Sequence, residues 1–431
     1  MTEPFIREIT IKNFKRFKDL TFELTEGINI LYGVNGVGKT SILEAINIAS
    51  GSFFMDISSV EKRLIKISDI RLAVYENTSS LPEYQFPVVI KAKGCVLEEV
   101  IEWTRTFNSI SGGTTNAGAK EMSRQSTRAA QFTQDGEKRE LPLIAYLSTQ
   151  RLFTERKTIK SDATKKPLGR FSGYYNSLNA TNTQKHIKAT LKDAEFEQYQ
   201  RRQSDTSFTD EGLESIYALV LRYFQDWKRI YYYEPASASR LDSGLYIVQK
   251  DGNIIPESLL SDGYRNFLWL LIDIAWRCYT LNPFLGKDAF TTTKGIVTID
   301  EIDLHLHPKW QQKILSILAE EFPNIQFVIT THSPIILSSV KGTVLMMEGD
   351  TITQQENLYG MKPSFILEAF MHIQERLPEL RPDIDRYFTH INNGNGKSPE
   401  ALAIRKDLEA KISLTEPMFT EADALIDFMS Y

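Results

Sequence analysis

The stretch GVNGVGKT, from Gly33 to Thr40, restricts the folds open to this chain more than any other feature. It matches the pattern G-x-x-x-x-G-K-[ST] and stands between an apolar strand-like run, INILYG, and a helical run. Glycines let the backbone curl so that successive N–H groups face a phosphate, and the helix N-terminus adds partial positive charge. We therefore expect an α/β core with a phosphate site made by Gly33, Asn35, Gly36, Val37, Gly38, Lys39, Thr40 and Ser41.

Two side chains of this loop suit a nucleoside triphosphate. Lys39 is predicted to reach the β and γ phosphates, and the Thr40 hydroxyl is predicted to ligate Mg²⁺. Carboxylates for the same metal are expected where a neighbouring buried strand ends, and GIVTIDEID places Asp300 and Glu301 there. We assign Asp300 to the Mg²⁺ shell and Glu301 to the general base that polarises the attacking water. The implied cofactors are ATP and Mg²⁺.

Three of the histidines that follow the carboxylates are candidates for a role near the site. His332, in ITTHSPI, stands at the end of the next predicted strand, at the carboxyl edge where ligands bind open parallel sheets. We predict that it senses the γ-phosphate. His305 and His307, in DLHLHP, have a metal-like spacing, but the sequence offers no third ligand, so we predict structural roles for both.

The pattern of apolar residues divides the chain into an ATPase head and additional parts. Short strands are expected over 5–33, 70–107 and 141–149, with a helix over 38–50. From residue 295 strands and helices alternate, which predicts a parallel, doubly wound sheet. Residues 1–150 and 291–350 should form the head, residues 151–290 a basic loop and a helical lobe, and residues 351–431 a helical tail.

Two segments of the middle region have their own composition. Residues 108–134 are rich in Ser, Thr, Gly, Asn and Gln, which predicts a flexible insertion. Between residues 104 and 170 there are 13 Lys or Arg against 6 Asp or Glu, and residues 150–170 are a candidate DNA surface. Further on, a dense apolar face predicts a helix over 209–233.

Charge and hydropathy exclude several classes of protein. A net charge of -5 argues against a wholly basic nucleic-acid binder, and no apolar run approaches 18 residues, so no membrane association is expected. Two cysteines form no framework and indicate a reducing compartment. We predict a cytoplasmic protein.

The segment SLLSDGYRN, ahead of the apolar run FLWLLIDI, has two readings. Ser261 or Asp262 can cap the helix that follows. Gly263, however, is a poor residue for a first helical turn, so capping alone does not account for the segment.

Taken in order, GVNGVGKT, LLSDGYRN, VTIDEIDLHLHP and ITTHSP resemble the motifs of the ABC-type ATPases in the group of recombination, cohesin-like and overcoming-lysogenization ATPases. The resemblance implies an ABC-ATPase head with a mixed sheet. It implies that Ser261 and Gly263, with Arg265 as a further contact, bind the γ-phosphate of nucleotide held by a partner subunit. It also implies Gln150 as a metal ligand and two heads that sandwich two ATP molecules.

More narrowly, LPLIAYLSTQR, NIIPESLLSDGYRN and NLYGMKPSFILEAFM resemble the PtuA family of ATPase subunits in Septu anti-phage systems. This resemblance implies an ATPase that assembles with itself and with a small HNH nuclease of the PtuB type. Nucleotide would then control DNA cleavage by that partner.

Two alternatives remain open at this point. In the first, the chain is itself a nuclease of the overcoming-lysogenization type, with Glu348, Asp383 and Asp385 as metal ligands of a Toprim domain. The residues around 360–380 are helical in pattern, however, and Asp383 and Asp385 are expected to open a helix after Pro382. In the second, the chain is a DNA-repair or recombination clamp.

Overall fold

The computed structural model describes residues 3–58, 60–74, 81–149, 169–179, 183–235, 242–355, 358–373 and 376–429. The chain divides into two compact units, Met1–Met361 and Lys362–Tyr431. Within the described ranges, no helix is long and apolar enough to cross a membrane.

The larger unit is built on a six-stranded mixed sheet. Five of its strands are parallel, and β16 adds an antiparallel edge next to β15. The strands, in spatial order, are β16 (Thr351–Gln355), β15 (Thr343–Glu348), β3 (Ile28–Tyr32), β14 (Ile325–Thr330), β13 (Gly295–Ile299) and β9 (Leu143–Leu147). The three central strands are buried along their whole length, as is typical of a parallel sheet covered on both faces.

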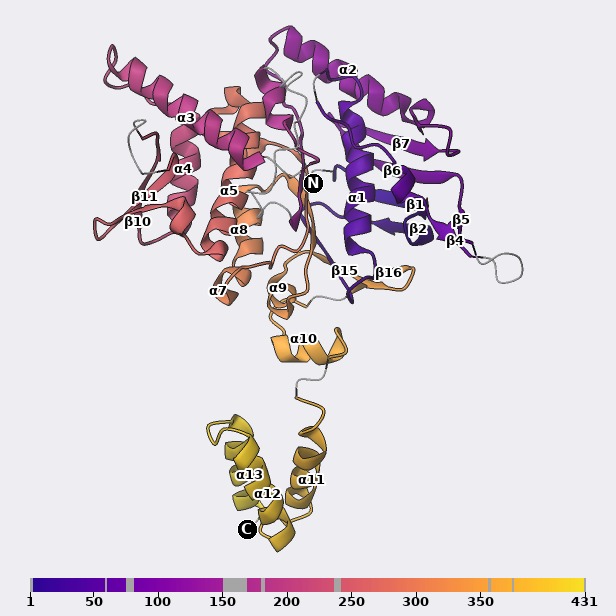
Figure 1. Ribbon diagram of the computed structural model, residues 1–431, viewed down its shortest axis with the longest axis vertical. Helices are drawn as coiled ribbons and strands as arrows, with labels where there is room; N and C mark the ends of the chain where they lie inside the picture. The colour runs from indigo at the N-terminus through magenta and orange to yellow at the C-terminus, as the bar shows by residue number, and fades with distance from the viewer. Residues whose placement is uncertain are drawn as a thin grey trace. The chain divides into compact units, whose positions relative to one another are not determined.

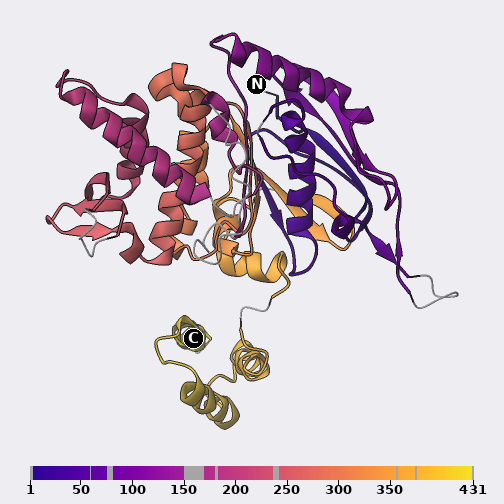
Figure 2. The same ribbon diagram turned by 45° about the horizontal axis from the view of Figure 1, so that its top comes forward.

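An antiparallel sheet packs across α1 (Lys39–Ser50) from the six-stranded sheet, so that this helix lies between the two sheets (Figures 1 and 2). Trp103 donates from its indole Nε1 to the Ala49 carbonyl, 2.9 Å away, and attaches this sheet to the helix. Its strands, in spatial order, are β2 (Phe17–Glu23), β1 (Glu8–Phe14), β6 (Val88–Val96), β7 (Glu99–Phe107) and β8 (Thr114–Thr115). A separate two-stranded ribbon consists of β4 (Leu72–Ala73) and β5 (Glu83–Tyr84).

The opposite face of the six-stranded sheet is covered by a lobe that contains α5 (Figure 1). This lobe holds α3 (Thr183–Arg202), α4 (Glu211–Tyr223), α5 (Asp262–Leu281) and a three-stranded sheet of β10 (Trp227–Tyr233), β11 (Gly244–Gln249) and β12 (Ile254–Pro256). Shorter helices complete the unit: α6 (Ala289–Thr292), α7 (Pro308–Gln311), α8 (Ile314–Glu321) and α9 (Pro334–Ser339).

The predicted helix over 209–233 is wrong in its second half. The helix ends at Tyr223, and WKRIYYY forms β10 instead. Aromatic residues favour strands, and Glu195 of α3 accepts from the backbone N–H of Tyr232 at 2.7 Å, which satisfies the strand at that point. The lobe predicted to be helical is therefore mixed.

The prediction of a flexible insertion over 108–134 is wrong for residues 120–134, which form α2 (Lys120–Gln134). Met122, Ala129 and Phe132 recur at helical spacing and are buried. Arg124 and Arg128 form ion pairs with Glu99 of β7. The first part of the segment is less regular, with the two-residue strand β8 and a short 3-10 helix over Ala117–Ala119.

Replacing Met122 with alanine tests this correction. The side chain is 0 % exposed and belongs to a helix that packs against β7 and the turn Gly51–Phe54, so its loss should cost about 2–5 kcal/mol of unfolding free energy. Thermal unfolding and amide hydrogen exchange over 120–134 measure the effect. Lys120→Ala, at an exposed position of the same helix, is the control. Rapid exchange of 120–134 in the wild-type protein would support the flexible insertion.

The smaller unit is helical in its described residues. It contains α10 (Pro363–Ala369), α11 (Arg381–Asn392), α12 (Pro399–Lys411) and α13 (Pro417–Phe428). The last three share a core that includes Tyr387, Leu408 and Phe419. The helical tail predicted from residue 351 therefore begins later, because residues 351–355 form the edge strand β16.

Asp383 lies in the first turn of α11, after Pro382, as predicted. Its carboxylate accepts from Arg386 and Lys411, and these hydrogen bonds lower its pKa. The strands that a Toprim domain requires around such acids are absent from the described part of residues 362–431.

Candidate functional site

The phosphate loop joins the carboxyl end of β3 to the first turn of α1. Gly36 and Gly38 have φ angles of 78° and 101°, in the left-handed region that favours glycine. A Cβ on Gly38 would also lie 2.6 Å from the ring of Phe17, so no larger residue fits. The eight residues predicted to contact phosphate are thus adjacent in one loop and one helical turn: Gly33, Asn35, Gly36, Val37, Gly38, Lys39, Thr40 and Ser41.

The Lys39 side chain folds back over this loop. Its Nζ donates to the carbonyl oxygens of Gly33 at 2.8 Å and Val34 at 3.2 Å. Burial lowers the pKa of Lys39, and the charges of Asp300, Glu301 and Asp303 oppose that shift. The lysine therefore lies within electrostatic reach of three acidic groups that come from the end of β13.

Thr40 and Asp300 meet at the predicted metal position. The threonine hydroxyl donates to the Asp300 carboxylate, with its Oγ1 3.0 Å from Oδ2. Asp300 is 4 % exposed, and its other oxygen accepts from the Thr330 hydroxyl at 2.6 Å. The loop and the end of β13, far apart in sequence, are thereby brought to one point.

Glu301 follows with a left-handed backbone, φ 47°. A non-glycine residue in this region stores strain, and such residues concentrate at functional sites. Its backbone N–H donates to Thr330 Oγ1 at 2.8 Å, so one threonine holds both acids in place.

His332 lies at the carboxyl end of β14, beside the same group of charges. Its pKa is lowered, first by burial and then by the nearby charge of Lys39, whereas Asp303, Glu301 and Asp300 raise it. The backbone N–H of His332 lies 3.4 Å from Asp303 Oδ1, and Thr331 donates to the same oxygen at 2.5 Å. The structure thus brings Lys39 and His332 together with the acids of β13.

Ser261 occupies the N-cap position of α5, but its side chain makes no capping hydrogen bond. It is exposed. Gly263 has a steric reason to be glycine, because a Cβ there would lie 2.5 Å from the His305 carbonyl oxygen. Arg265 donates to Asp262 at 2.6 Å. The helix α5, which begins at these signature residues, and α1, which begins at the phosphate loop, cover opposite faces of the six-stranded sheet (Figure 1).

The remaining predicted positions differ in outcome. His307 caps α7, with its Nδ1 accepting from the Lys309 N–H at 3.2 Å, which agrees with a structural role. Gln150 lies outside the described residues, as does most of the basic segment 150–170. Arg170, which is described, donates to the Leu281 carbonyl at 2.7 Å.

Five residues at or near the site were missed from the sequence. Arg16 donates to the Gly36 carbonyl at 2.8 Å, from the turn between β1 and β2. For Thr330 and Thr331 the sequence did hold a signal, because ITTHSP places two adjacent threonines before a histidine. The missed residues are Arg16, Asn266, Asp303, Thr330 and Thr331.

A family profile described as "AAA domain, putative AbiEii toxin, Type IV TA system" matches residues 28–338, a range that runs from β3 through the phosphate loop to α9. The chain belongs to this family. The α/β ATPase-head fold predicted from the motifs is confirmed by this match and by the mixed sheet beneath the phosphate loop.

The chain is also similar to a retron ATPase and to a Septu protein. It is 27% identical over 387 residues to "Retron Vc95 probable ATPase" of Vibrio cholerae serotype O1 biovar El Tor, covering 78% of this chain and 71% of the relative. It is 27% identical over 433 residues to "Septu protein PtuA" of Bacillus mycoides (strain KBAB4), covering 97% of this chain. The chain spans only 52% of the length of that PtuA protein. Among solved structures, an SMC head bound to the C-winged helix domain of ScpA has a TM-score of 0.48 at 14% identity, covering 82% of this chain and 97% of the other.

The site of this AAA-domain chain fits the ATP and Mg²⁺ implied by the motifs. Mg²⁺ is usually held by one or two protein oxygens together with phosphate oxygens and waters. The Thr40 hydroxyl and the Asp300 carboxylate, 3.0 Å apart, are such a pair of oxygens beside the phosphate loop. The left-handed glycines supply the cradle.

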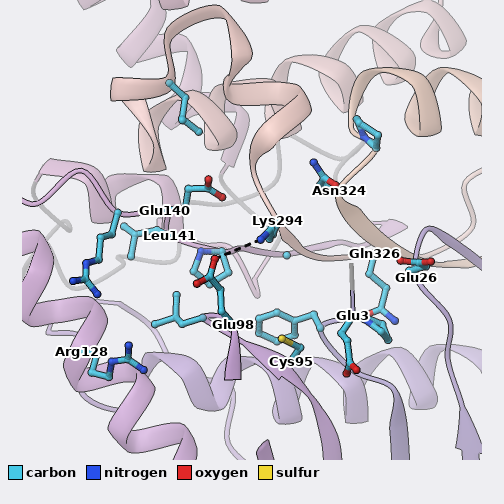
Figure 3. Close-up of a pocket in the computed structure, with 18 of the residues that line it drawn as sticks. Glu3, Glu26, Cys95, Glu98, Arg128, Glu140, Leu141, Lys294, Asn324 and Gln326 are labelled. Carbon is cyan, nitrogen blue, oxygen red and sulfur yellow. Dashed lines mark ion pairs between the residues drawn. The ribbon is translucent and has the colours of Figure 1, made fainter. Parts of the chain in front are cut away.

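A cavity of about 710 Å³ lies away from the phosphate loop (Figure 3). It is lined by segments that precede β3, β9, β13 and β14, so it is at the amino ends of the strands. Its polar side chains carry both signs of charge, including a Lys294–Glu98 ion pair of 3.8 Å. Burial raises the pKa of Glu140 in its wall. This cavity is not part of the phosphate site.

Proposed function

We propose that this protein is the ATP-binding and ATP-hydrolysing subunit of an anti-phage defence complex. In this role it is a nucleotide-sensing scaffold for a small HNH nuclease that cleaves DNA. The observation that carries the ATPase part is the Thr40–Asp300 contact of 3.0 Å beside Lys39. The similarity to a Septu protein over 97% of the chain supports the defence role.

Each residue of the site has a distinct part in hydrolysis. Lys39 and the loop N–H groups bind the phosphates and offset their charge. Thr40 and Asp300 hold Mg²⁺, which supplies electrostatic stabilisation of the transferring phosphoryl group when bound. Glu301 orients and polarises the attacking water, and His332 contacts the γ-phosphate. Gln150 is a further metal ligand in this proposal.

The working unit is a dimer that encloses two ATP molecules. Ser261, exposed and without a capping bond, and Gly263 contact the γ-phosphate bound to the partner's phosphate loop, with Arg265 beside them. The position of α5 across the sheet from α1 supports a contribution to the partner rather than to the same chain. DNA would contact the basic segment 150–170.

Co-purification tests the proposed partner and the sign of nucleotide control together. A tagged chain expressed from its native operon should retain a small HNH protein, identified by mass spectrometry. DNA cleavage by the purified complex should change by roughly 5- to 150-fold between no ATP and saturating ATP, the usual span of coupling between two sites.

The control for this experiment is Lys39→Ala, which should keep the partner and lose the response to ATP. Recovery of recombination proteins instead of an HNH protein would favour a DNA-repair clamp. Cleavage by the chain without any partner would favour a self-contained nuclease.

A further inference from the structure

The cavity of about 710 Å³ at the amino ends of the strands has the size and the lining of a small-molecule site. Ligand sites usually measure about 300–1,000 Å³ and combine apolar walls with a few polar groups. The apolar wall includes Phe5, Phe132 and Leu141, all of which are buried. They come from the N-terminal segment, from α2 and from the segment before β9. An apolar ligand body therefore meets side chains from separate parts of the chain.

The acidic part of the cavity is centred on Glu140. Its side chain is half-buried and has no hydrogen bond or ion pair among the described residues. Burial raises its pKa, the charge of Lys294 opposes that rise, and the charge of Glu98 adds to it. A carboxylate that is partly removed from water without a direct partner is unfavourable. A cation placed beside Glu140 would offset that cost.

Lys294 is the nearest cation, but it does not fill this role. It pairs with Glu98 at 3.8 Å, and the two side chains are 51% and 86% exposed, so their attraction is weak. Figure 3 shows Lys294 together with Glu98 and Glu140, and Arg128 apart from this group. Two carboxylates thus share one loosely held ammonium group, which leaves negative charge unpaired at this end of the cavity.

The other cations of the lining have partners elsewhere or face solvent. Arg128 forms an ion pair with Glu99, and Arg139 forms one with Glu137. Neither of these glutamates lines the cavity. Lys138 is exposed. The cavity therefore has no unpaired, buried positive group among its described residues that would favour an anionic ligand.

The turn that carries Glu98 has a strained backbone. Leu97 and Glu98 are the two central residues of the β6–β7 hairpin, because Val96 pairs with Glu99. Their φ angles are 47° and 69°, and such turns usually contain Asn-Gly because both positions need a positive φ. Strained residues concentrate at ligand sites, and both of these residues line the cavity.

We infer that this cavity binds a small organic amine. The ammonium group lies against Glu140, with Glu98 at the rim, and the apolar body of the ligand contacts Phe5 and Phe132. Aromatic walls suit such a ligand, because ring faces attract cations as well as apolar groups. The cavity is separate from the phosphate loop, so this inference does not depend on the proposed function.

Three probes with the same phenylbutyl body test the charge of the ligand. Phenylbutylamine carries an ammonium group, phenylbutanol is neutral, and phenylbutyrate is anionic. Ligand-observed NMR measures their binding to the full chain, with a saturating non-hydrolysable ATP analogue and Mg²⁺ to occupy the phosphate site. The amine should bind roughly five- to ten-fold more tightly than the alcohol, between the effects of an exposed ion pair and a buried charged hydrogen bond. Absence of binding, equal binding of the three probes or a preference for phenylbutyrate would overturn the inference.

Glu140→Gln should bring the affinity for phenylbutylamine down to that for phenylbutanol and leave the affinity for phenylbutanol unchanged. Glu102→Gln is the matched control, because Glu102 is an exposed carboxylate of β7 that pairs with Lys91 at 2.9 Å and does not line the cavity. A preference for the amine that survives Glu140→Gln would overturn the assignment.

Lys294→Met provides a test in the opposite direction. Methionine keeps the apolar part of the side chain and removes the ammonium group that competes for Glu98 and Glu140. Affinity for phenylbutylamine should rise by roughly two- to five-fold, as expected for a weak ion pair. A fall in affinity would contradict the inference, and this variant remains informative if Glu140→Gln does not fold.

Cys95 reports where the probe binds. It is half-buried in the cavity wall, whereas Cys278, the other cysteine of the chain, is fully buried. Bound phenylbutylamine should slow the alkylation of Cys95 by iodoacetamide roughly two-fold or more, because the reaction requires an accessible thiolate. Mass spectrometry of the peptide that contains Cys95 measures the rate. Unchanged alkylation with the amine bound would place the probe elsewhere and overturn the site.

Discussion

Replacing Glu301 with glutamine should reduce ATP hydrolysis by roughly 10²–10⁴-fold, the usual contribution of general acid–base catalysis, while ATP binding is retained. Glutamine keeps the length of the side chain, and the backbone N–H bond to Thr330 does not involve the carboxylate. Because hydrolysis would no longer separate the two heads, the ATP-bound dimer should accumulate. Single-turnover hydrolysis and sedimentation velocity with ATP and Mg²⁺ measure both effects.

Glu348→Gln is the matched control, because Glu348 ends β15, another parallel strand of the same sheet, and is exposed. Removal of this carboxylate should change hydrolysis by less than about two-fold, as for surface positions in general. A Glu301→Gln protein that sediments as a monomer with ATP and Mg²⁺ would contradict the sandwich dimer.

Ser261→Arg should leave ATP affinity unchanged and reduce hydrolysis by about 10²–10³-fold, the effect of losing one preorganised donor to the transition state. Ser261 is exposed, makes no capping hydrogen bond and belongs to a helix on the other face of the sheet from α1. The arginine therefore leaves the phosphate loops free to bind ATP and obstructs only the closing of one head over the nucleotide of the other. Titration with a fluorescent ATP analogue, together with steady-state turnover, separates binding from hydrolysis.

Ser258→Arg introduces the same side chain three residues earlier, at another exposed position. It should retain turnover and so controls for the added charge near a helix N-terminus, which costs about 0.3–1 kcal/mol. If Ser261→Arg abolishes nucleotide binding instead, Ser261 acts only within its own chain.

Much of the ATPase head could be predicted because its motifs stand at strand ends. GVNGVGKT follows the apolar strand β3, and the acids of GIVTIDEID follow the apolar strand β13. Parallel strands bring their carboxyl ends to one edge of the sheet. The close approach of Thr40 to Asp300 follows from that geometry. The glycine positions of the phosphate loop were also predictable, because a curled loop needs residues with a left-handed backbone, which glycine adopts most readily.

The errors arose where tertiary contacts decide between two local patterns. The helical spacing of Val220 and Phe224 continues to Trp227, so the sequence pattern does not show where β10 begins. The strand is accompanied by a hydrogen bond from the Tyr232 N–H to Glu195, and Glu195 belongs to α3, a helix formed by an earlier part of the chain. Asn266 was missed for a similar reason. Its partner, the Leu304 carbonyl, is a backbone atom of another segment, and no motif spacing identifies such a pair.

The order of strands in the six-stranded sheet has a consequence for how the protein is made. β3, which carries the phosphate loop, is buried along its length and pairs only with β14 and β15, whose residues are translated about 300 positions later. The antiparallel hairpins β1–β2 and β6–β7 can form soon after they leave the ribosome, because their partners are near in sequence. During most of synthesis, β3 therefore has no partner strand at either edge, and its apolar side chains are not yet buried. Nascent chains of this protein are therefore expected to depend on chaperones, and nucleotide can stabilise the chain only after β15 has emerged.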